Sequence, residues 1–396
     1  MKLELLSPCG DMESLKAAIL YGADAVYVGG EAFGLRANAG FTIAELSEAV
    51  DYAHERSVKV YLTCNIVADN SDIDRFTGFI KQLPPVDAVI VSDMGIFDIL
   101  RTQLPEMPVH VSTQAGVMNY AAANMLYKLG ARRIVLARET SLTDIKKIRE
   151  SIPHELELEV FVHGAMCVSY SGRCLLSSYM TNRDANKGIC SHPCRWSYHL
   201  MEESRPGEFF KIYEDDENTF ILNSKDLCMI GYINELSTSG VTALKIEGRA
   251  KTAYYTATIT NAYRAAITAF RNGEKLPDWV RREVDCVSHR QYSTGFYFGD
   301  AEQYHKDSGY IRNCDFIGTV DGYSDNLLEI TVRNYFTVDD HIEIVQPGLP
   351  PQKLMISEMY NSTGEAVKIA NHAMEKMKIL CSDVYKTGSM LRRVNV

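Results

Sequence analysis

The sequence of 396 residues contains no apolar run that approaches the length of about 18 residues needed to cross a membrane. Its first residues, MKLELLSPCGDMES, lack the apolar core and small-residue cleavage site of a secretory signal. Positive charge is not in excess, because 41 Lys and Arg residues face 51 Asp and Glu residues, for a net charge of −10. We therefore expect a cytoplasmic protein without a membrane segment, in which binding of nucleic acid requires a local basic patch.

Several familiar catalytic motifs are also missing. No G-x-G-x-x-G turn follows the first predicted strand, where SPCGDMES stands instead, and this argues against a doubly wound dinucleotide-binding sheet. The sequence has no G-x-S-x-G nucleophile elbow, and HELEL at 154–158 lacks the second histidine of the H-E-x-x-H zinc motif. Nothing in these patterns builds a protease site.

Short apolar runs rich in valine, isoleucine and tyrosine alternate with amphipathic stretches through the first two thirds of the chain. Their composition predicts β-strands at 3–8, 24–30, 59–65, 88–93, 108–114, 132–139, 158–164 and 243–249. Eight consecutive βα units predict an α/β protein with a closed parallel (β/α)8 barrel, a fold that typically takes about 250 residues.

The predicted barrel domain spans residues 1–272. The connection after its seventh strand is too long for a simple loop, so residues 164–222 are predicted to be an insertion at the C-terminal face, where such enzymes place their chemistry. The stretch at 224–240 is predicted to be the helix that precedes strand eight. After an irregular connector at 273–308, residues 309–396 show the alternation and turns of a small antiparallel β-barrel-like domain.

Polar side chains follow the predicted strands and should share one cleft, because the C-terminal ends of barrel strands meet at one face. Such residues are also common without a function, since strand ends are solvated. Arginines gathered in a concave site suit a small dianionic ligand, because a guanidinium binds a carboxylate through two hydrogen bonds. The residues expected at the cleft are Arg36, Asn65, Gln114, Arg138, Glu139, His163, Glu247 and Arg249.

Three of these residues, His163, Glu139 and Glu247, are the candidate catalytic groups. A strand-end histidine is suited to proton transfer, but it is at least as often a structural hydrogen-bonding residue. Lys245 and Lys251 belong to the basic segment KIEGRAK, which either contacts phosphate or is the solvated start of a helix.

The cysteines provide the most specific signal, because four of the ten fall between 167 and 194. Disulfides are unfavourable in a reducing cytoplasm. Structural zinc usually has ligands about 2–4 residues apart, and Cys190 and Cys194 fit that spacing whereas Cys167 and Cys174 do not. An iron–sulfur cluster also takes four thiolates and tolerates wider spacing, so it is favoured over zinc, with four unrelated thiols as a third possibility. Cys228, on the helix predicted to close the loop, is a reserve ligand.

Several segments resemble the signature segments of the collagenase-like peptidase family U32. These are EVFVHGAMCVSYSGRCLLSSY, RDANKGICSHPCRW, NSKDLC and ALKIEGRAK. Further segments, including MPVHVSTQA, RRIVLARETSL, HRQYSTGF and VRNYFTVDDHIEIVQP, extend the resemblance over nearly the whole chain. They are most similar to the bacterial branch that makes 5-hydroxyuridine at the wobble position of tRNA.

The resemblance implies prephenate-dependent tRNA hydroxylation in place of proteolysis, and it implies a [4Fe–4S] cluster on the four clustered cysteines, with zinc as an alternative occupant. Prephenate is a dicarboxylate. Barrel geometry and charge assign it to a set of side chains that comprises Arg36, Arg138, Arg195, Arg249, Gln114 and Asn65. The tRNA is expected at the basic edge formed by Lys245 and Lys251 and at the C-terminal β-domain.

Sister branches of the family hydroxylate a ribosomal cytidine or assist quinone-ring hydroxylation. A zinc-containing collagenase-like peptidase or peptide-binding protein is the alternative of a different class. Cys9 stands where relatives usually carry a small residue, so it is an unexpected thiol near the expected cleft.

Overall fold

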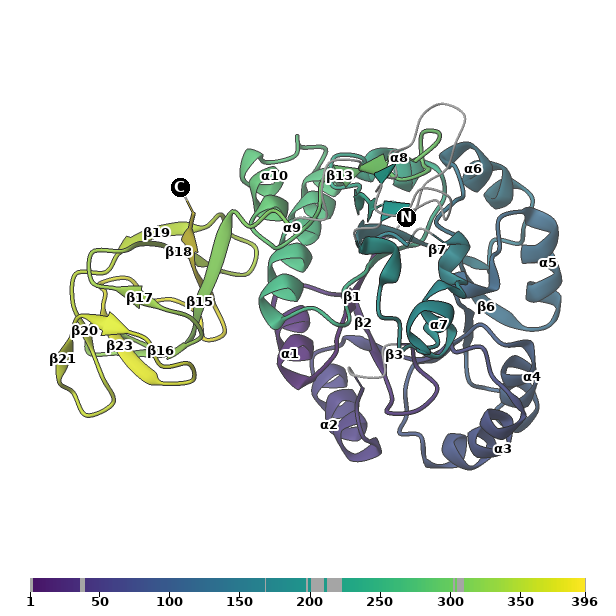
Figure 1. Ribbon diagram of the computed structural model, residues 1–396, viewed down its shortest axis with the longest axis horizontal. Coiled ribbons are helices and arrows are strands. Elements are labelled where there is room, and N and C mark those ends of the chain that lie inside the picture. The colour runs from purple at the N-terminus through teal and green to yellow at the C-terminus, as the bar shows by residue number, and fades with distance from the viewer. Residues whose placement is uncertain are drawn as a thin grey trace.

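The protein is described by a computed structural model that covers residues 3–35, 40–167, 169–196, 199–200, 210–211, 223–301, 303–304 and 310–395. Eight parallel strands form a closed barrel in chain order (Figure 1). They are β1 (Glu4–Pro8), β2 (Ala25–Gly29), β3 (Lys59–Cys64), β4 (Ala88–Val91), β5 (Val109–Val111), β6 (Ala131–Val135), β7 (Glu157–Gly164) and β12 (Ala243–Ile246). Strand β12 pairs with both β7 and β1, which closes the barrel and confirms the predicted fold.

Helices surround the barrel, and the sequence sets where several of them begin. They are α1 (Met12–Leu20), α2 (Ile43–His54), α3 (Asn70–Phe79), α4 (Met94–Gln103), α5 (Tyr120–Lys128), α6 (Leu142–Glu150), α8 (Ile233–Thr238) and α9 (Ala253–Asn272), with short 3-10 turns η1 (Ile80–Gln82) and η2 (Thr113–Ala115). Asp11, Thr42 and Asp69 form capping boxes that satisfy the first backbone N–H groups of α1, α2 and α3. No helix in the described ranges is long and apolar enough to cross a membrane.

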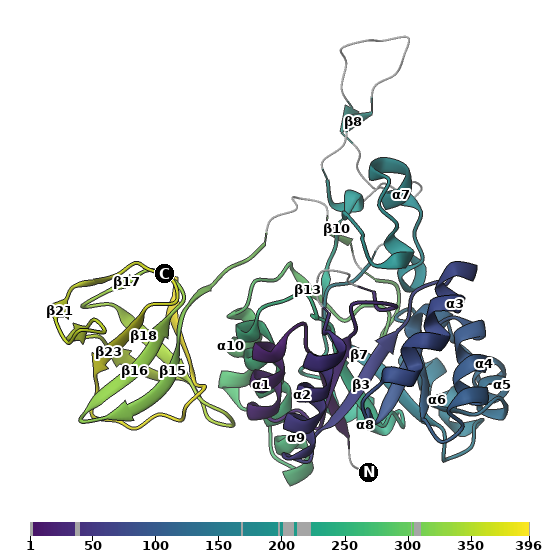
Figure 2. The same ribbon diagram turned by 90° about the horizontal axis from the view of Figure 1, so that it is seen from below.

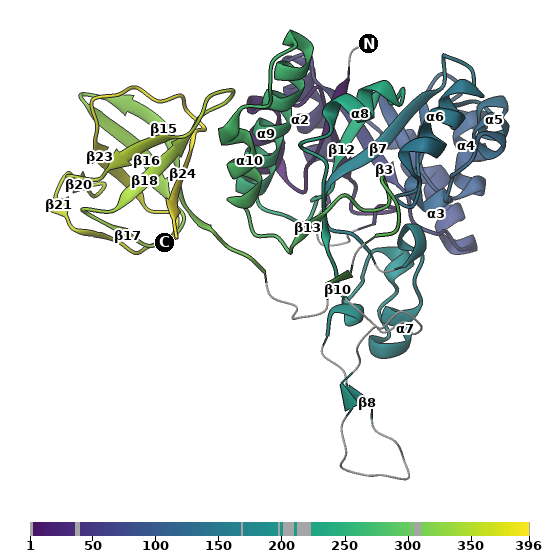
Figure 3. The same cartoon turned by 90° about the horizontal axis from the view of Figure 1, so that it is seen from above.

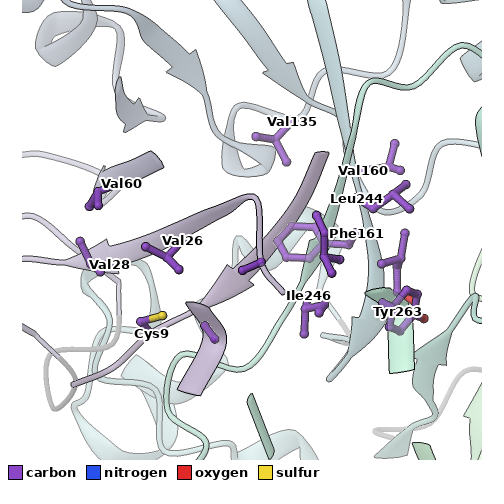
Figure 4. Packing of buried hydrophobic residues seen from close by; sticks show 14 of the residues in the cluster. Cys9, Val26, Val28, Val60, Val135, Val160, Phe161, Leu244, Ile246 and Tyr263 are labelled. Carbon is purple, nitrogen blue, oxygen red and sulfur yellow. Dashed lines mark hydrogen bonds between the residues drawn. The ribbon is translucent and has the colours of Figure 1, made fainter. Parts of the chain in front are cut away.

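The main apolar core lies between the strands and the helices, and Figure 4 shows part of its packing. Val26 and Val28 of β2 pack there beside Cys9, which is fully buried. Burial raises the pKa of the Cys9 thiol well above its ordinary value. Cys9 is therefore a protonated core residue, and the expectation of an extra thiol near the cleft is corrected.

The lumen of the barrel holds a network of buried charges. Arg133 contacts Glu4 at 2.6 Å and Glu159 at 3.0 Å through Nη1. The Lys245 ammonium lies 2.8 Å from the other oxygen of Glu159. Each charge faces an opposite one, as buried charges must to offset their loss of hydration.

An insertion follows β7 and rises above the C-terminal ends of the strands, opposite the end that carries the N-terminus (Figure 2). Its described elements are η3 (Tyr170–Gly172), α7 (Leu176–Thr181), η4 (Ala185–Lys187), η5 (Pro193–Arg195) and the strand pair β8 (His199–Leu200) and β9 (Phe210–Lys211). Figure 3 shows α7, β8 and β10 at this same end of the barrel.

The prediction of a helix over residues 224–240 is largely wrong. Only α8 is helical, while the first part forms β10 (Asn223–Ser224) and β11 (Asp226–Cys228). Strand β11 runs antiparallel to β7, with Leu227 opposite Gly164. Strand β7 extends past its pairing with β6, which ends at Glu159, and this free edge overrides the local helical pattern.

The segment predicted as a connector returns to the barrel. Helix α10 (Asp278–Asp285) packs against α9, β13 (Tyr292–Ser293) pairs with β11, and β14 (Gln303–Tyr304) pairs with β10. Residues 278–293 therefore contribute to the barrel domain.

The C-terminal domain is antiparallel β-structure with its own core. Its strands are β15 (Cys314–Ser324), β16 (Leu327–Val332), β17 (Phe336–Thr337), β18 (His341–Val345), β19 (Gln352–Met355), β20 (Met359–Tyr360), β21 (Ala366–Val367), β22 (Ile369–Ala370), β23 (Lys376–Leu380) and β24 (Met390–Val394). Figure 1 shows this domain beside α9 and α10.

Helix α9 is shared by the two domains. Its residues from Ala253 to Tyr263 are all buried. Tyr263 donates a hydrogen bond to the carbonyl of Val162 in the barrel at 2.6 Å. Tyr254 stacks on Phe316 of the C-terminal domain, with ring centroids 5.0 Å apart. The helix therefore has packed surfaces on both sides.

A buried ion network also joins the domains. Arg392 of β24 is fully buried and donates to Glu283 of α10 at 3.1 Å and to Glu343 of β18 at 2.9 Å. Arg282 donates to the other oxygen of Glu343 at 2.7 Å. The network sits where a barrel-domain helix meets the C-terminal sheet.

Replacing Arg392 by Met should lower the free energy of unfolding by about 3–5 kcal/mol, because the buried carboxylate of Glu283 loses its cationic partner and Glu343 keeps only Arg282. Denaturant unfolding of the full chain measures this loss. The neighbouring Arg393, which is partly exposed beside Asp315, is the matched control and should cost less than about 1 kcal/mol when changed to Met. Equal effects of the two substitutions would contradict a buried inter-domain network.

Candidate active site

A cavity of about 140 Å³ opens at the C-terminal ends of the barrel strands, below the insertion. The structure brings most of the sequence-predicted residues to its wall. Those that line it are Asn65, Gln114, Arg138, Lys245, Glu247, Arg249, Cys167, Cys174, Cys190 and Cys194. The cavity thus combines side chains from the barrel strands with thiols from the insertion.

The barrel side of the cavity is cationic. Arg138, Lys245, Arg249 and Arg290 line it, whereas Glu247 is the one carboxylate among the described lining residues. Arg138 reaches Glu247 through Nη2 at 3.1 Å, and both side chains are partly exposed to the cavity. A pair of this kind can exchange partners with an incoming carboxylate.

The side chain of Arg249 fits into its position because residue 29 is a glycine. Its side chain is buried and donates through Nη1 to the hydroxyl of Thr63. A Cβ added at Gly29 would lie 2.4 Å from Nη1 of Arg249 and 2.7 Å from its Cζ. Glycine at the end of β2 therefore allows the guanidinium to lie across the mouth of the barrel.

Gln114 presents an unused acceptor to the cavity. Its side chain is only 4% exposed, and its Oε1 has no hydrogen-bond partner among the described residues. Asn65 is fixed by contrast, because its Oδ1 accepts from the Leu35 amide at 3.2 Å and its Nδ2 donates to Ser112 at 3.4 Å. A buried acceptor without a partner is unfavourable, so a ligand that donates N–H or O–H to Gln114 would gain a hydrogen bond.

The insertion is tied to the barrel loops around the four thiols. Both carboxylate oxygens of Glu139 accept hydrogen bonds from Ser171, from its amide at 2.6 Å and from its hydroxyl at 2.8 Å. Lys187 pairs with Asp72 at 3.2 Å and contacts Asp69. Glu139 therefore holds the insertion, and it does not line the cavity itself.

The thiols receive hydrogen bonds from the insertion's own backbone. Leu176 N–H donates to Cys174 Sγ and His192 N–H donates to Cys190 Sγ, each at 3.3 Å. Both sulfur atoms thus accept a backbone hydrogen bond from the residue two positions later. Across the described residues, no three His, Cys, Asp or Glu side chains converge closely enough to hold a single metal ion.

His163 does not face the cavity. The register between β7 and β12 shifts after Lys245, so that His163 lies opposite Ile246, whose side chain belongs to the outer core. The bulge turns the histidine toward the helix layer, where its Nδ1 and Nε2 lie 3.4 Å from the hydroxyls of Tyr263 and Tyr292. The expected catalytic position of His163 is thereby corrected.

Burial lowers the pKa of His163 to about 3. Its imidazole is neutral at physiological pH and packs within a layer of tyrosines. This environment matches the structural role of a strand-end histidine.

Other predicted residues also lie elsewhere than expected. Lys245 is buried in the barrel beside Glu159, so it forms the floor of the cavity and is shielded from a polymer outside. Lys251 is half-buried, with its ammonium 5.2 Å from the Tyr310 ring. Cys228 lies on β11 and faces a different pocket, and burial raises its pKa to about 11, so it does not join the four thiols. Arg36 and the side chain of Arg195 lie outside the described part of the protein.

Arg290 is a site residue that the sequence analysis missed. It lines the cavity, is 2% exposed, and its Nη2 lies 2.7 Å from Asp226 while its Nε lies 2.9 Å from the same oxygen. Arg290 belongs to the segment HRQYSTGF, which the resemblance to the family had singled out. Because this segment follows α9 in the sequence, nothing placed it at the mouth of the barrel. The β11–β13 pairing brings it there.

Fold and site together define a barrel protein of the enzyme type, with a ligand cavity at the C-terminal mouth covered by a cysteine-rich insertion. The chain belongs to peptidase family U32. The model of that family matches residues 10–307, and the model of the U32 C-terminal domain matches residues 312–392. The resemblance found in the sequence is thus confirmed.

Curated relatives of the chain carry different names. It is 35% identical to tRNA hydroxylation protein P1 of Bacillus subtilis, over 99% of this chain and 95% of the relative. It is 37% identical to a 23S rRNA 5-hydroxycytidine synthase of Escherichia coli, over 73% of this chain and 42% of the relative. It is 34% identical to a collagenase of Porphyromonas gingivalis, over 80% of this chain and 79% of the relative.

The buried state of His163 predicts a pH dependence of stability. The ordinary pKa of histidine is 6.5, so between pH 6.5 and about 3 the unfolded chain binds a proton that the folded protein does not. The free energy of unfolding should therefore fall as the pH falls through this window. In His163→Phe this slope should be smaller by about 1.4 kcal/mol per pH unit, as measured by denaturant unfolding at several pH values.

The same property can be observed directly. The ring signals of His163 in NMR spectra should not titrate between pH 5 and 8. A titration of His163 inside that range would contradict its burial and return it to the candidate catalytic groups.

Proposed function

We propose that this protein takes part in the hydroxylation of RNA, forming 5-hydroxyuridine at the wobble position of tRNA. The observation that carries the proposal is the cavity in which four cationic side chains meet four clustered thiols. The similarity to tRNA hydroxylation protein P1 covers nearly the whole of both chains and supports tRNA as the substrate. The similarity to the rRNA hydroxycytidine synthase covers less than half of that relative and makes ribosomal RNA the alternative substrate.

The cationic wall suits a small dicarboxylate, for which we propose prephenate. Arg138 follows β6 and Arg249 follows β12, and Arg290 and Lys245 line the same cavity. A guanidinium can bind each carboxylate through two hydrogen bonds. Gln114 would accept a hydrogen bond from a hydroxyl or N–H group of the bound molecules.

Glu247 is the candidate group for proton transfer. It is the one carboxylate that lines the cavity among the described residues, and Arg138 donates a hydrogen bond to it at 3.1 Å. A carboxylate in this position can accept a proton from a molecule bound in the cavity. His163 is unsuited to this role because it is buried behind the strand.

We propose that the four insertion thiols hold a [4Fe–4S] cluster, because such a cluster takes four thiolate ligands and tolerates their wide spacing in the sequence. The proposal is supported by the cavity that all four thiols line. Cys167, Cys174, Cys190 and Cys194 would hold the cluster, which when bound supplies one-electron redox chemistry.

Deleting the gene should remove 5-hydroxyuridine from tRNA, as measured by mass spectrometry of tRNA nucleosides. The wild-type gene should restore the nucleoside, whereas Arg249→Met should restore little, because the guanidinium at the mouth is lost. Arg56→Met is the control, since Arg56 is exposed just after the C-terminal end of α2, beside Glu55, and this variant should restore the nucleoside fully. An unchanged tRNA profile in the deletion strain, with 5-hydroxycytidine lost from ribosomal RNA, would replace tRNA by the alternative substrate.

Cys174→Ser should abolish the visible absorbance of protein purified without oxygen, because one thiolate ligand of the cluster is lost. Cys228→Ser and Cys381→Ser are matched controls outside the cavity and should keep the colour. Iron and zinc are quantified on the same samples. Colourless wild-type protein with stoichiometric zinc, which also cleaves an unfolded protein, would favour the zinc-containing peptidase.

A further inference from the structure

The outer surface of the insertion exposes an unusual set of large apolar and aromatic side chains. Soluble proteins rarely expose such side chains in a contiguous group unless the surface binds something. Tyr179 is 83% exposed and Trp196 is 47% exposed. Further exposed side chains of the insertion are Tyr170, Leu175, Met180 and Ile189.

Two of these side chains belong to segments of the insertion that pack against each other. Tyr179 lies on α7 and Trp196 directly follows η5, and α7 contacts η5. The contact is fixed by Ser191, which hydrogen-bonds Ser177 at 3.1 Å and Thr181 at 2.7 Å through the side chains. Figure 2 shows α7 standing out from the barrel end.

A groove of about 590 Å³ leads from this surface to the cavity. It runs between the insertion and the loops that follow β3 and β4, and its wall includes Val67, Met94, Arg173 and Leu175. Cys174 lines both the groove and the cavity. Leu175 and Tyr179 are four residues apart at the start of α7, a spacing that places them on one helix face.

The part of the insertion that carries the exposed aromatic side chains is basic. Residues 164–196 contain four basic residues, Arg173, Arg183, Lys187 and Arg195, and one acidic residue, Asp184, so that 4 − 1 = +3. The acidic residues of the insertion lie mostly in 197–222, and the insertion as a whole has a net charge of −2. Asp184 accepts a hydrogen bond from the Asn186 amide at 2.8 Å. The charge of residues 164–196 therefore favours a polyanion at this part of the insertion.

We propose that this basic and aromatic face of the insertion, with the groove beside it, binds a single-stranded loop of RNA on either side of the nucleotide that enters the cavity. The proposal rests on the proposed function, because a uracil base can reach the cavity only after leaving its stack. Neighbouring bases then lose a stacking partner, and exposed aromatic rings replace it. Arg173 and Arg183 are both exposed, and each donates a hydrogen bond through Nε to a backbone carbonyl, so that both guanidinium groups are held at the surface for contact with phosphates.

A duplex does not fit this surface equally well. Its bases are hidden between the strands, so the aromatic rings would gain nothing beyond contact with the backbone. The surface therefore selects a splayed loop, and the phosphate contacts make the binding dependent on salt.

The test measures binding of a fluorescently labelled anticodon stem-loop to the full-length protein, purified without oxygen, by fluorescence anisotropy. Tyr179→Ala should weaken binding roughly five- to hundredfold, the loss expected for one base–aromatic stack. Arg183→Gln should lower the slope of log affinity against log salt by about 0.7. The matched control is Tyr335→Ala, a half-exposed tyrosine of the C-terminal domain, which should bind as wild type does.

A fully paired RNA of equal length should compete weakly and equally with all variants. The proposal is overturned if Tyr179→Ala binds the stem-loop as tightly as wild type, or if the duplex competes as well as the stem-loop. If Tyr179→Ala keeps its RNA affinity but loses hydroxylation in the cell, the surface serves a protein partner and the proposal also fails. If the deletion strain keeps its tRNA modification while stem-loop binding depends on Tyr179, the RNA surface stands and only the proposed reaction falls.

Discussion

The pairing of β7 with β12 closes the barrel, and its register decides which side chains reach the cavity. Up to Lys245 the two strands are in regular register, so that Lys245 and Phe161 point into the lumen. The shift after that pair sends His163 to the opposite side. On its other edge β7 extends past the end of β6 and pairs with β11, and β11 in turn brings β13 and Arg290 to the mouth. The two edges of β7 thus position much of the site.

The outline of the fold could be predicted from the sequence because its signals are local. Strand composition, helix caps and the order of βα units each depend on neighbouring residues, and the strands occur where those signals place them. The mouth residues Arg138, Glu247 and Arg249 followed from the same logic, since strand ends in a closed barrel meet at one face. The spacing of the cysteines indicated one shared region, and all four line one cavity.

What could not be predicted depends on pairing over long distances. A bulge has no sequence signal in the strand that carries it, so His163 was expected in the cavity. The segment around Cys228 has a helical pattern, but the free edge of β7 makes it a strand. In the sequence, Lys245 and Lys251 belong to one basic segment. In the structure, the alternation of side chains along β12 directs Lys245 inward to Glu159, whereas Lys251 lies outside the lumen. Asp226 and Arg290 meet only because β11 and β13 are neighbours.

The two-sided burial of α9 has a consequence for how the protein can be divided. The sequence predicts that the C-terminal domain begins at residue 309, but α9 packs its tyrosines against both domains. Separating the two domains would expose apolar side chains of the barrel domain as well as of the C-terminal domain. A boundary drawn along the sequence is therefore not a boundary between two independent surfaces in the molecule.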